Sequence, residues 1–280
     1  MLHQPPLSAL TPQILAIETS SERLSLAILQ GDSTYVREID AGQRHSELAI
    51  AALADLLAEA KLTLADIDVI AFGQGPGSFV GVRIACGLAQ GLALGADKPL
   101  IAVPTQLALA EQARRDYPNL SRVLIAVDAR MGEFYVAAFE VDAVGAKEDA
   151  ADAANAADAM GWRTVVAPML AKADQLPHLS GHDWHSIGSG FDVPARSAQL
   201  TARYAGQLIN ILSNRLPSAV DVARIAARQW AAQQNIPGAA IGMSPEFAAP
   251  LYLRNHVAMT IAERLTAKEL KLTAMPGAAA

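Results

Sequence analysis

Residues 68–95 read DVIAFGQGPGSFVGVRIACGLAQGLALG and contain a short apolar run, a glycine-rich turn and a long apolar segment in succession. The run at 68–72 has the length of a buried strand. The segment at 79–95 carries one charge and no polar face of any size, which predicts a helix that is covered all round. A strand that leads through a turn into a helix is the repeating unit of α/β sheets, so this stretch indicates an α/β fold.

The same alternation of elements continues on both sides of this stretch. Upstream, strand-like runs at 13–18, 24–29 and 33–39 predict a three-stranded meander, which a helical pattern follows at 44–60. A second strand–turn–strand unit repeats this opening. The elements predicted downstream are a strand at 100–103, a helix at 106–115, the repeated strands at 122–127 and 133–139, a helix at 218–234 with Ser218 as N-cap, and a terminal helix at 259–271.

Length and composition fit two domains of ordinary size. The chain has 280 residues, of which 52% are hydrophobic and 5% aromatic, so we expect a core of Ala, Leu, Ile and Val. Polar residues near Tyr117 interrupt the apolar periodicity and indicate the domain boundary. The predicted ranges are a loose tail at 1–12, domains at 13–117 and 118–256, a low-complexity excursion at 142–160, and a closing helix and tail at 257–280.

Charge and cysteine content exclude several classes of protein. The formal net charge of −6, without a basic cluster, argues against a chain that binds nucleic acid unaided. Cys86 is the only cysteine, which excludes an intramolecular disulfide and fits a reducing compartment. The first residues show no export signal, and the segment at 79–95 is short for a bilayer and contains Arg83. We therefore expect a cytoplasmic protein without a membrane span.

Two turns are candidates for holding a phosphate. The turn at 18–21 offers hydroxyl groups, although we favour an ordinary polar hairpin turn there. The turn at 73–78 opens a helix, whose N-terminal N–H groups attract anions. It lacks the Gly-Lys-Ser/Thr ending of a Walker loop, so a turn that only orients the helix is an equal alternative. The candidate residues are Thr19, Ser20, Gly75, Gly77 and Ser78.

Small residues follow one side of each predicted helix in the first domain. Gly87, Gly91 and Gly95 have i, i+4 spacing, which allows another helix to approach closely. The helix at 44–60 adds an alanine face. Two helices with surplus apolar surface predict an interface with another chain, in preference to packing within the domain.

The histidines at 178, 182 and 185 do not form a convincing metal site. His178 and His182 have i, i+4 spacing, but Pro177 and Gly181 argue against the helix that would bring both imidazoles to one face. We expect a loop of solvated histidines, His185 included, and no metal.

Five segments together resemble the TsaB family, also called YeaZ. Their order and spacing match those of the family, and the resemblance covers most of residues 13–256. The segments are ILAIETS at 14–20, RHSEL at 44–48, GPGSFVGVRI at 75–84, VDARMGEFY at 127–135 and PLYLR at 250–254.

The resemblance implies an actin-like fold of the ribonuclease H-like type, in which two related domains each contain a mixed five-stranded sheet and flanking helices. It also implies a non-catalytic subunit that binds TsaD, the catalytic paralogue, in a complex that the ATPase TsaE joins. This complex transfers threonylcarbamoyl, supplied as an adenylate by TsaC, to the adenosine beside the anticodon of tRNAs that read ANN codons. Contact with tRNA is then expected only through the complex. No cofactor is expected on this chain alone, because ATP or ADP is expected to bind only to the assembled complex. A homodimer is expected where TsaD is absent.

The resemblance also assigns residues. The metal-binding H-x-x-x-H motif of the catalytic paralogue corresponds to Thr105 and Leu109 here, which implies a pseudoenzyme. Glu18 stands where many members have aspartate and Val80 where many have threonine, and both departures weaken a claim to nucleotide binding. The partner is expected on the helices at 44–60 and 79–95. Candidate interface residues are His45, Leu48, Ala51, Ala52, Gly81, Arg83, Gly87 and Gly91.

Two enzyme functions stay open as alternatives. A small-molecule kinase of the same fold needs carboxylates for magnesium, and Glu18 and Asp128 are the paired acidic candidates at strand ends. A metallopeptidase-like enzyme would need the histidines that are missing at Thr105 and Leu109.

Overall fold

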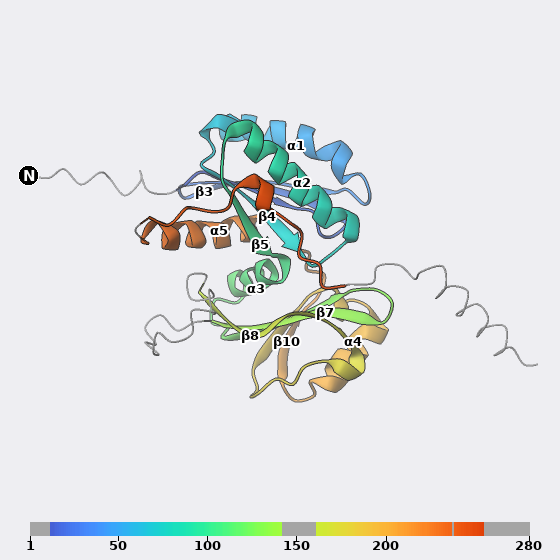
Figure 1. The fold of residues 1–280 in the computed structure, drawn as a ribbon. Coiled ribbons are helices and arrows are strands. Elements are labelled where there is room, and N and C mark those ends of the chain that lie inside the picture. Colours follow the sequence, from blue (N-terminus) through green and yellow to red (C-terminus); the bar gives the residue numbers. More distant parts are fainter. Residues whose placement is uncertain (1–11, 142–160, 237, 255–280) are drawn as a thin grey trace, which may run out of the picture.

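A computed structural model describes residues 12–141, 161–236 and 238–254 of the chain (Figure 1). The described residues form two five-stranded sheets. The first has the order β3-β2-β1-β4-β5, in which β1, β2 and β3 are antiparallel neighbours and β1, β4 and β5 are parallel ones. Its strands are β1 (Ile14–Glu18), β2 (Arg23–Gln30), β3 (Ser33–Asp40), β4 (Val69–Gly75) and β5 (Leu100–Pro104).

The second sheet repeats this topology. From its β8 edge the order is β8-β7-β6-β9-β10, with the same succession of antiparallel and then parallel pairs. The β6–β7 turn therefore corresponds to the β1–β2 turn, and the loop after β9 to the loop after β4. The strands are β6 (Arg122–Asp128), β7 (Glu133–Val141), β8 (Trp162–Lys172), β9 (Trp184–Ile187) and β10 (Leu208–Leu212).

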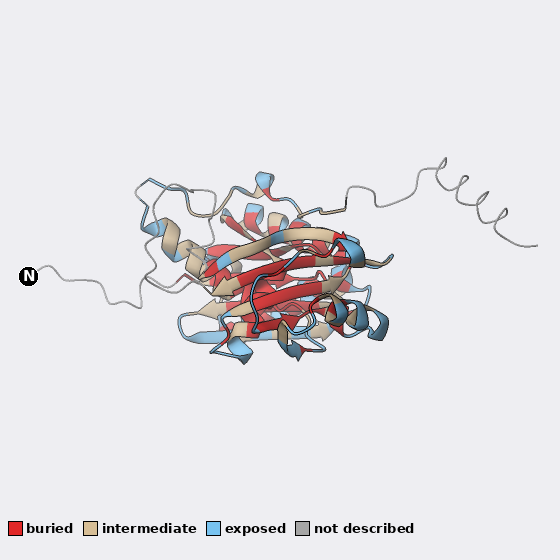
Figure 2. Cartoon of the chain, turned by 90° about the horizontal axis from the view of Figure 1, so that it is seen from below, coloured by how far each residue is buried: buried red, intermediate tan, exposed pale blue. Residues whose placement is uncertain are grey.

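Helices cover the outer faces of both sheets and fill the space between them (Figure 1). α1 (His45–Ala60) and α2 (Phe79–Ala96) lie on the outer face of the first sheet, and α4 (Pro194–Arg203) lies on that of the second. Between the sheets, α3 (Thr105–Asp116) and α5 (Ala219–Gln234) share one core with residues of both sheets. Burial is accordingly concentrated in the central strands (Figure 2). The predicted fold class, α/β and actin-like with two related halves, is confirmed.

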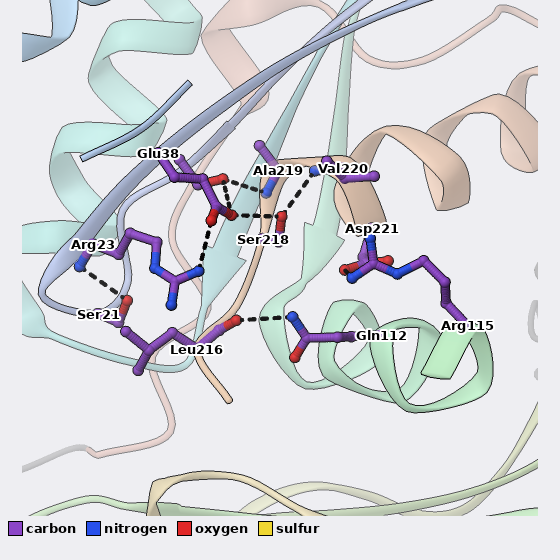
Figure 3. Close-up of polar contacts among 11 residues, drawn as sticks. Ser21, Arg23, Glu38, Gln112, Arg115, Leu216, Ser218, Ala219, Val220 and Asp221 are labelled. Atoms are coloured by element: carbon purple, nitrogen blue, oxygen red, sulfur yellow. Dashed lines mark hydrogen bonds and ion pairs between the residues drawn. The ribbon is translucent and has the colours of Figure 1, made fainter. Parts of the chain in front are cut away.

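The predicted boundary near residue 117 separates the strands of the two sheets, but it does not separate the helices. Although it follows all the strands of the second sheet, α5 packs against β1, β2 and β4 of the first. Its N-terminus is anchored there, because Ala219 N donates to Ser25 Oγ at 2.9 Å. Ser218, the predicted N-cap, accepts from Val220 N and donates to Glu38 Oε1 at 3.1 Å (Figure 3). The chain thus returns to the first half after it has completed the second.

Each strand and helix predicted within the described residues is present. The sequence did not predict β8, β9, α4 or β10, which complete the second half. The excursion at 142–160, the helix at 259–271, the tail at 257–280 and all but the last residue of the tail at 1–12 lie outside the described residues.

Candidate functional site

A cleft of about 460 Å³ opens where the two halves meet. The β1–β2 turn and the glycine-rich loop after β4 form one wall. The β6–β7 turn and Ser189 form the other, and residues 251–254 also line the cleft. Its polar lining residues are Ser20, Ser21, Glu22, Ser78, Thr105, Asp128, Arg130, Tyr135, Ser189, Tyr252 and Arg254.

Glu18 ends β1 behind this cleft and is fully buried. Its Oε1 accepts a hydrogen bond from Ser20 N at 2.6 Å, and its Oε2 accepts one from Thr105 Oγ1 at 3.0 Å. Burial raises the pKa of the Glu18 carboxyl, and the hydrogen bonds from Ser20 and Thr105 oppose that rise. The carboxyl group is thus enclosed by its own chain and does not line the cleft.

Three glycines allow the first-half loops to pack this closely. A Cβ at Gly73 would overlap Glu18 Oε2, and a Cβ at Gly81 would overlap Thr19 O. At Gly77 it would lie 2.5 Å from Ser20 Cβ. These glycines are required by contacts inside the chain. A side chain at Gly73 would displace the Glu18 carboxyl, and one at Gly77 or Gly81 would push the β1–β2 turn away from the start of α2.

The five predicted loop residues come together, but only Ser20, Gly77 and Ser78 line the cleft. Thr19 Oγ1 donates to Gly81 O at 2.8 Å, and Gly75 N donates to Thr105 Oγ1 at 3.2 Å. The Ser78 hydroxyl caps α2 by accepting from Gly81 N, while Ser78 N donates to Ser20 O at 2.7 Å. Four of the five, Thr19, Ser20, Gly75 and Ser78, therefore make contacts that fix the two loops, and phosphate binding by this loop pair stays a prediction.

The opposite wall repeats the arrangement with an acid that does reach the cleft. Asp128 ends β6 as Glu18 ends β1, and its Oδ1 lies 3.6 Å from Arg196 Nε and accepts from Arg130 N at 3.0 Å. Asp128 N donates to Ser189 Oγ at 3.1 Å. The kinase alternative expected Glu18 and Asp128 to act together, whereas only Asp128 lines the cleft.

Sequence reasoning missed Ser189 and Tyr135 as cleft residues. Ser189 follows β9, a strand that was not predicted, and lies between two glycines. A Cβ at Gly188 would overlap Ala126 O, and its φ of 121° favours glycine. This Gly-Ser-Gly run was the available signal, equivalent in position to the glycine-rich loop after β4.

Thr105 and Leu109, the two positions expected to correspond to the metal-binding motif of the catalytic paralogue, do not form a metal site here. Thr105 lines the cleft, but its hydroxyl bridges Glu18 Oε2 and Gly75 N. Leu109 is buried in the core between the sheets. Across 12–141, 161–236 and 238–254, no group of three or more His, Cys, Asp or Glu side chains is placed to hold a metal ion.

The predicted histidine loop is partly wrong. His178 and His182 are exposed, as expected for solvated side chains. His185 instead lies in β9 and is buried, with its ring 5.2 Å from that of Tyr117. Loss of solvation lowers the pKa of its imidazole. His185 was misassigned because β9 is short and carries polar residues.

A second surface feature lies on the outer side of α1 and α2. Ile50, Val80 and Leu94 are 58%, 62% and 68% exposed. A Cβ built at Gly87, Gly91 or Gly95 meets no atom within 4 Å, so these glycines face open space. We call this surface the two-helix face; its residues are Ile50, Ala51, Val80, Arg83, Gly87, Gly91, Leu94 and Gly95.

The predicted interface residues divide between this face and the core. Ala51, Arg83, Gly87 and Gly91 are exposed and Leu48 is half-buried. The structure corrects the prediction at the remaining positions, which lie in the interior because α1 and α2 turn them toward the first sheet and the β1–β2 turn. These positions are His45, Ala52 and Gly81.

By length and composition, α2 is the one helix in the described part of the chain that is apolar enough to cross a membrane. Its buried side, however, includes Val82, Ala85 and Ala89 and packs against β4. Through this side α2 belongs to the core of the first half.

Comparisons with known proteins agree with this architecture. A family model described as "TsaD: tRNA N6-adenosine threonylcarbamoyltransferase" matches residues 38–262. The Escherichia coli K12 "tRNA threonylcarbamoyladenosine biosynthesis protein TsaB" is 34% identical over 247 residues, which cover 88% of this chain and 96% of that protein. The Haemophilus influenzae protein of the same name is 30% identical over 248 residues, covering 87% and 94%. A solved structure titled "YeaZ from Pseudomonas aeruginosa" has a TM-score of 0.70 at 28% identity and covers 86% of this chain and 100% of that one.

Proposed function

Because this chain belongs to the TsaB family, we propose that it is a non-catalytic subunit that binds TsaD and supports threonylcarbamoyl transfer to tRNA. The relatives are named as tRNA threonylcarbamoyladenosine biosynthesis proteins, so the chain is a protein of that pathway. The finer role, binding of TsaD, is argued from the surface of the first half.

The observation that carries the proposal is the two-helix face. Exposed glycines inside a helix lower its stability, and those at 87 and 91 have no neighbour within the described chain that requires them. They lie among exposed apolar residues such as Val80 and Leu94. A surface of this kind suits a helix of a partner that approaches closely and removes the apolar side chains from water.

The chemistry of the cleft supports a non-catalytic role. Thr105 and Leu109 offer no imidazole for a metal, and the Glu18 carboxyl is bonded to Thr105 and Ser20. We assign catalysis to TsaD. TsaE is the further member of the complex, TsaC supplies the adenylate, and we place all of them in the cytoplasm. ATP, ADP and tRNA are assigned to the assembled complex, because this chain has a net charge of −6 and no Walker loop.

The proposal is tested by association with TsaD from the same organism, measured by calorimetry and by size-exclusion chromatography with light scattering. Leu94→Glu is expected to weaken association at least about a hundredfold, because it buries a carboxylate without a partner. Ile209→Glu is the matched control, since Ile209 is 51% exposed on β10 of the second sheet and should leave association unchanged.

Equal binding by Leu94→Glu and the wild-type chain would exclude the two-helix face as the TsaD interface. Failure of the wild-type chain to bind TsaD, with kinase activity or bound metal in this chain alone, would refute the proposed function. Self-association that Leu94→Glu abolishes would assign the same face to a homodimer formed without TsaD.

A further inference from the structure

Residues 250–254, which we call the strap, contact both walls of the cleft. At the first wall, Leu251 N donates to Gln74 O at 2.7 Å, next to the glycine-rich loop. At the second wall, Arg254 Nη2 donates to Ala129 O at 2.9 Å and lies 2.6 Å from Glu133 Oε2. Ala129 lies in the β6–β7 turn and Glu133 begins β7, so the strap joins the two halves along the lining of the cleft.

The Arg254 contact is stronger than an ordinary surface ion pair. The side chains of Arg254 and Glu133 are only 17% and 22% exposed, so water screens their charges less. One guanidinium nitrogen is shared between a carboxylate and a backbone carbonyl. Charge-assisted hydrogen bonds are stronger than neutral ones, and this geometry also fixes the position of the Arg254 guanidinium.

The middle of the strap contacts the two-helix face. The Tyr252 ring lies 6.3 Å from the Phe79 ring, at the first residue of α2. The Arg83 guanidinium carbon lies 3.3 Å from the centre of the Phe79 ring and 4.7 Å from that of Tyr252. Arg83 also donates to Phe79 O at 2.8 Å, so the N-terminal turn of α2 and the strap are held together.

We propose that the strap couples the width of the cleft to the two-helix face. Arg254 holds the β6–β7 turn at a fixed distance from the glycine-rich loop, and Tyr252 transmits a change in that distance to Phe79 and Arg83. The part of this inference that concerns TsaD rests on the proposed function. The tethering of the two halves by Arg254 does not, which allows the two to be tested separately.

The tether is tested by distances between spin labels at Asp32→Cys on the β2–β3 turn and Gln199→Cys on α4, in a Cys86→Ser background. Both labelled positions are exposed and lie away from the cleft and the two-helix face. Arg254→Ala is expected to lengthen and broaden the distance distribution. Glu133→Gln, which removes the charge from the other side of the pair, should give a smaller change in the same direction. Thermal unfolding of each variant establishes that it is folded.

Arg122→Ala is the matched control. Arg122 also combines one ion pair, to Glu140 Oε1 at 3.0 Å, with one bond to a carbonyl, His182 O at 3.3 Å. All three residues belong to the second half, so loss of these contacts should leave the distances between the halves unchanged. The tether would be refuted if Arg254→Ala and Arg122→Ala changed the distance distribution equally. It would also be refuted if neither variant changed the distribution.

The coupling is tested by TsaD affinity in the same variants. Arg254→Ala should weaken association roughly 5- to 150-fold, the usual range of a coupling between two sites, while Arg122→Ala binds as the wild-type chain does. Altered distances with unchanged TsaD affinity would refute the coupling and leave the proposed function intact. If the wild-type chain itself fails to bind TsaD, the proposed function fails, and the label distances still decide whether Arg254 tethers the halves.

Discussion

Replacing Gly87 and Gly91 together by alanine is expected to make the chain more stable and its association with TsaD weaker. Both residues lie in the interior of α2, which spans 18 residues, and neither has a positive φ. A Cβ at either position meets no atom within 4 Å, so a methyl group fits without a shift of any neighbour. Each glycine in a helix interior costs about 0.8–1 kcal/mol relative to alanine.

The double variant should therefore gain about 1.5–2 kcal/mol in the free energy of unfolding. For a chain of this size, about 1 kcal/mol raises Tm by roughly 2–4 °C, so a rise of about 3–8 °C is expected in calorimetry. At the interface the same methyl groups intrude where a partner backbone approaches. Overpacking of this kind costs about 1–3 kcal/mol, which corresponds to roughly a 5- to 150-fold higher Kd for TsaD.

The opposite signs of the two changes make the test sharp, because a folding defect cannot explain weaker binding by a more stable protein. A Tm equal to or below that of the wild-type chain would show that these positions are not open. A higher Tm with unchanged Kd would show that the glycines do not contact TsaD, and the argument from their cost in stability would fail.

Other predictions concern the core and its polar groups. Gly73→Ala should destabilise the chain by about 1–3 kcal/mol or more, because the new Cβ overlaps Glu18 Oε2. Adding Glu18→Asp, which shortens the acidic side chain, should recover part of the lost stability. An unchanged free energy of unfolding for Gly73→Ala in urea would contradict this packing. Ser218→Ala should lower the free energy of unfolding by about 1 kcal/mol, because it removes the N-cap of α5 and the hydrogen bond to Glu38. An unchanged midpoint of urea unfolding would show that the cap is dispensable. Asp221 is fully buried, its oxygens accept no hydrogen bond among the described residues, and Arg115 Nη2 lies 3.4 Å away (Figure 3). Burial raises the pKa of Asp221 to about 7, with Arg115 opposing the rise. The folded state then binds the proton more tightly than the unfolded state, in which the pKa is near 3.8, so this carboxyl makes stability fall as pH rises between about 4 and 7. Asp221→Asn should flatten that dependence, and equal pH slopes for both proteins in urea unfolding would refute it.

How far the sequence predicts this structure depends on the kind of contact that defines each element. The first half was predicted because β1, β4 and α2 are apolar along their whole buried length, which leaves a clear periodic signal. The unpredicted strands lack that signal: β8 is half-exposed over most of its length and contains Pro168, and β9 has four residues, one of them His185. Their strand conformation is decided by pairing with β6 and β7, which local sequence does not record.

The cleft residues were also predicted only where the local sequence carries a signal. Both turns of the first wall were found from their glycine and hydroxyl residues, but their contacts with each other were not, because Glu18 and Thr105 are 87 positions apart. The strap is further removed, since Arg254 reaches Glu133 across 121 positions. Nor does periodicity indicate that α5 returns to the first sheet after the second is complete, because an amphipathic helix carries no record of which sheet it covers.

Glycines of one motif serve two different purposes, and only the atoms around them distinguish the two. A side chain at Gly73 would overlap the Glu18 carboxyl, and one at Gly77 or Gly81 would separate the β1–β2 turn from the start of α2. Gly87 and Gly91, in the next two turns of the same helix, have no such close neighbour. In the first set, Gly73 leaves the space that the buried Glu18 carboxyl occupies, and this carboxylate does not line the cleft. The second leaves backbone open on the outer surface, at a cost in helix stability that the isolated chain does not recover. If that cost is offset by a partner, as we propose, then one stretch of sequence both leaves space for a buried acidic group and creates the surface that binds TsaD.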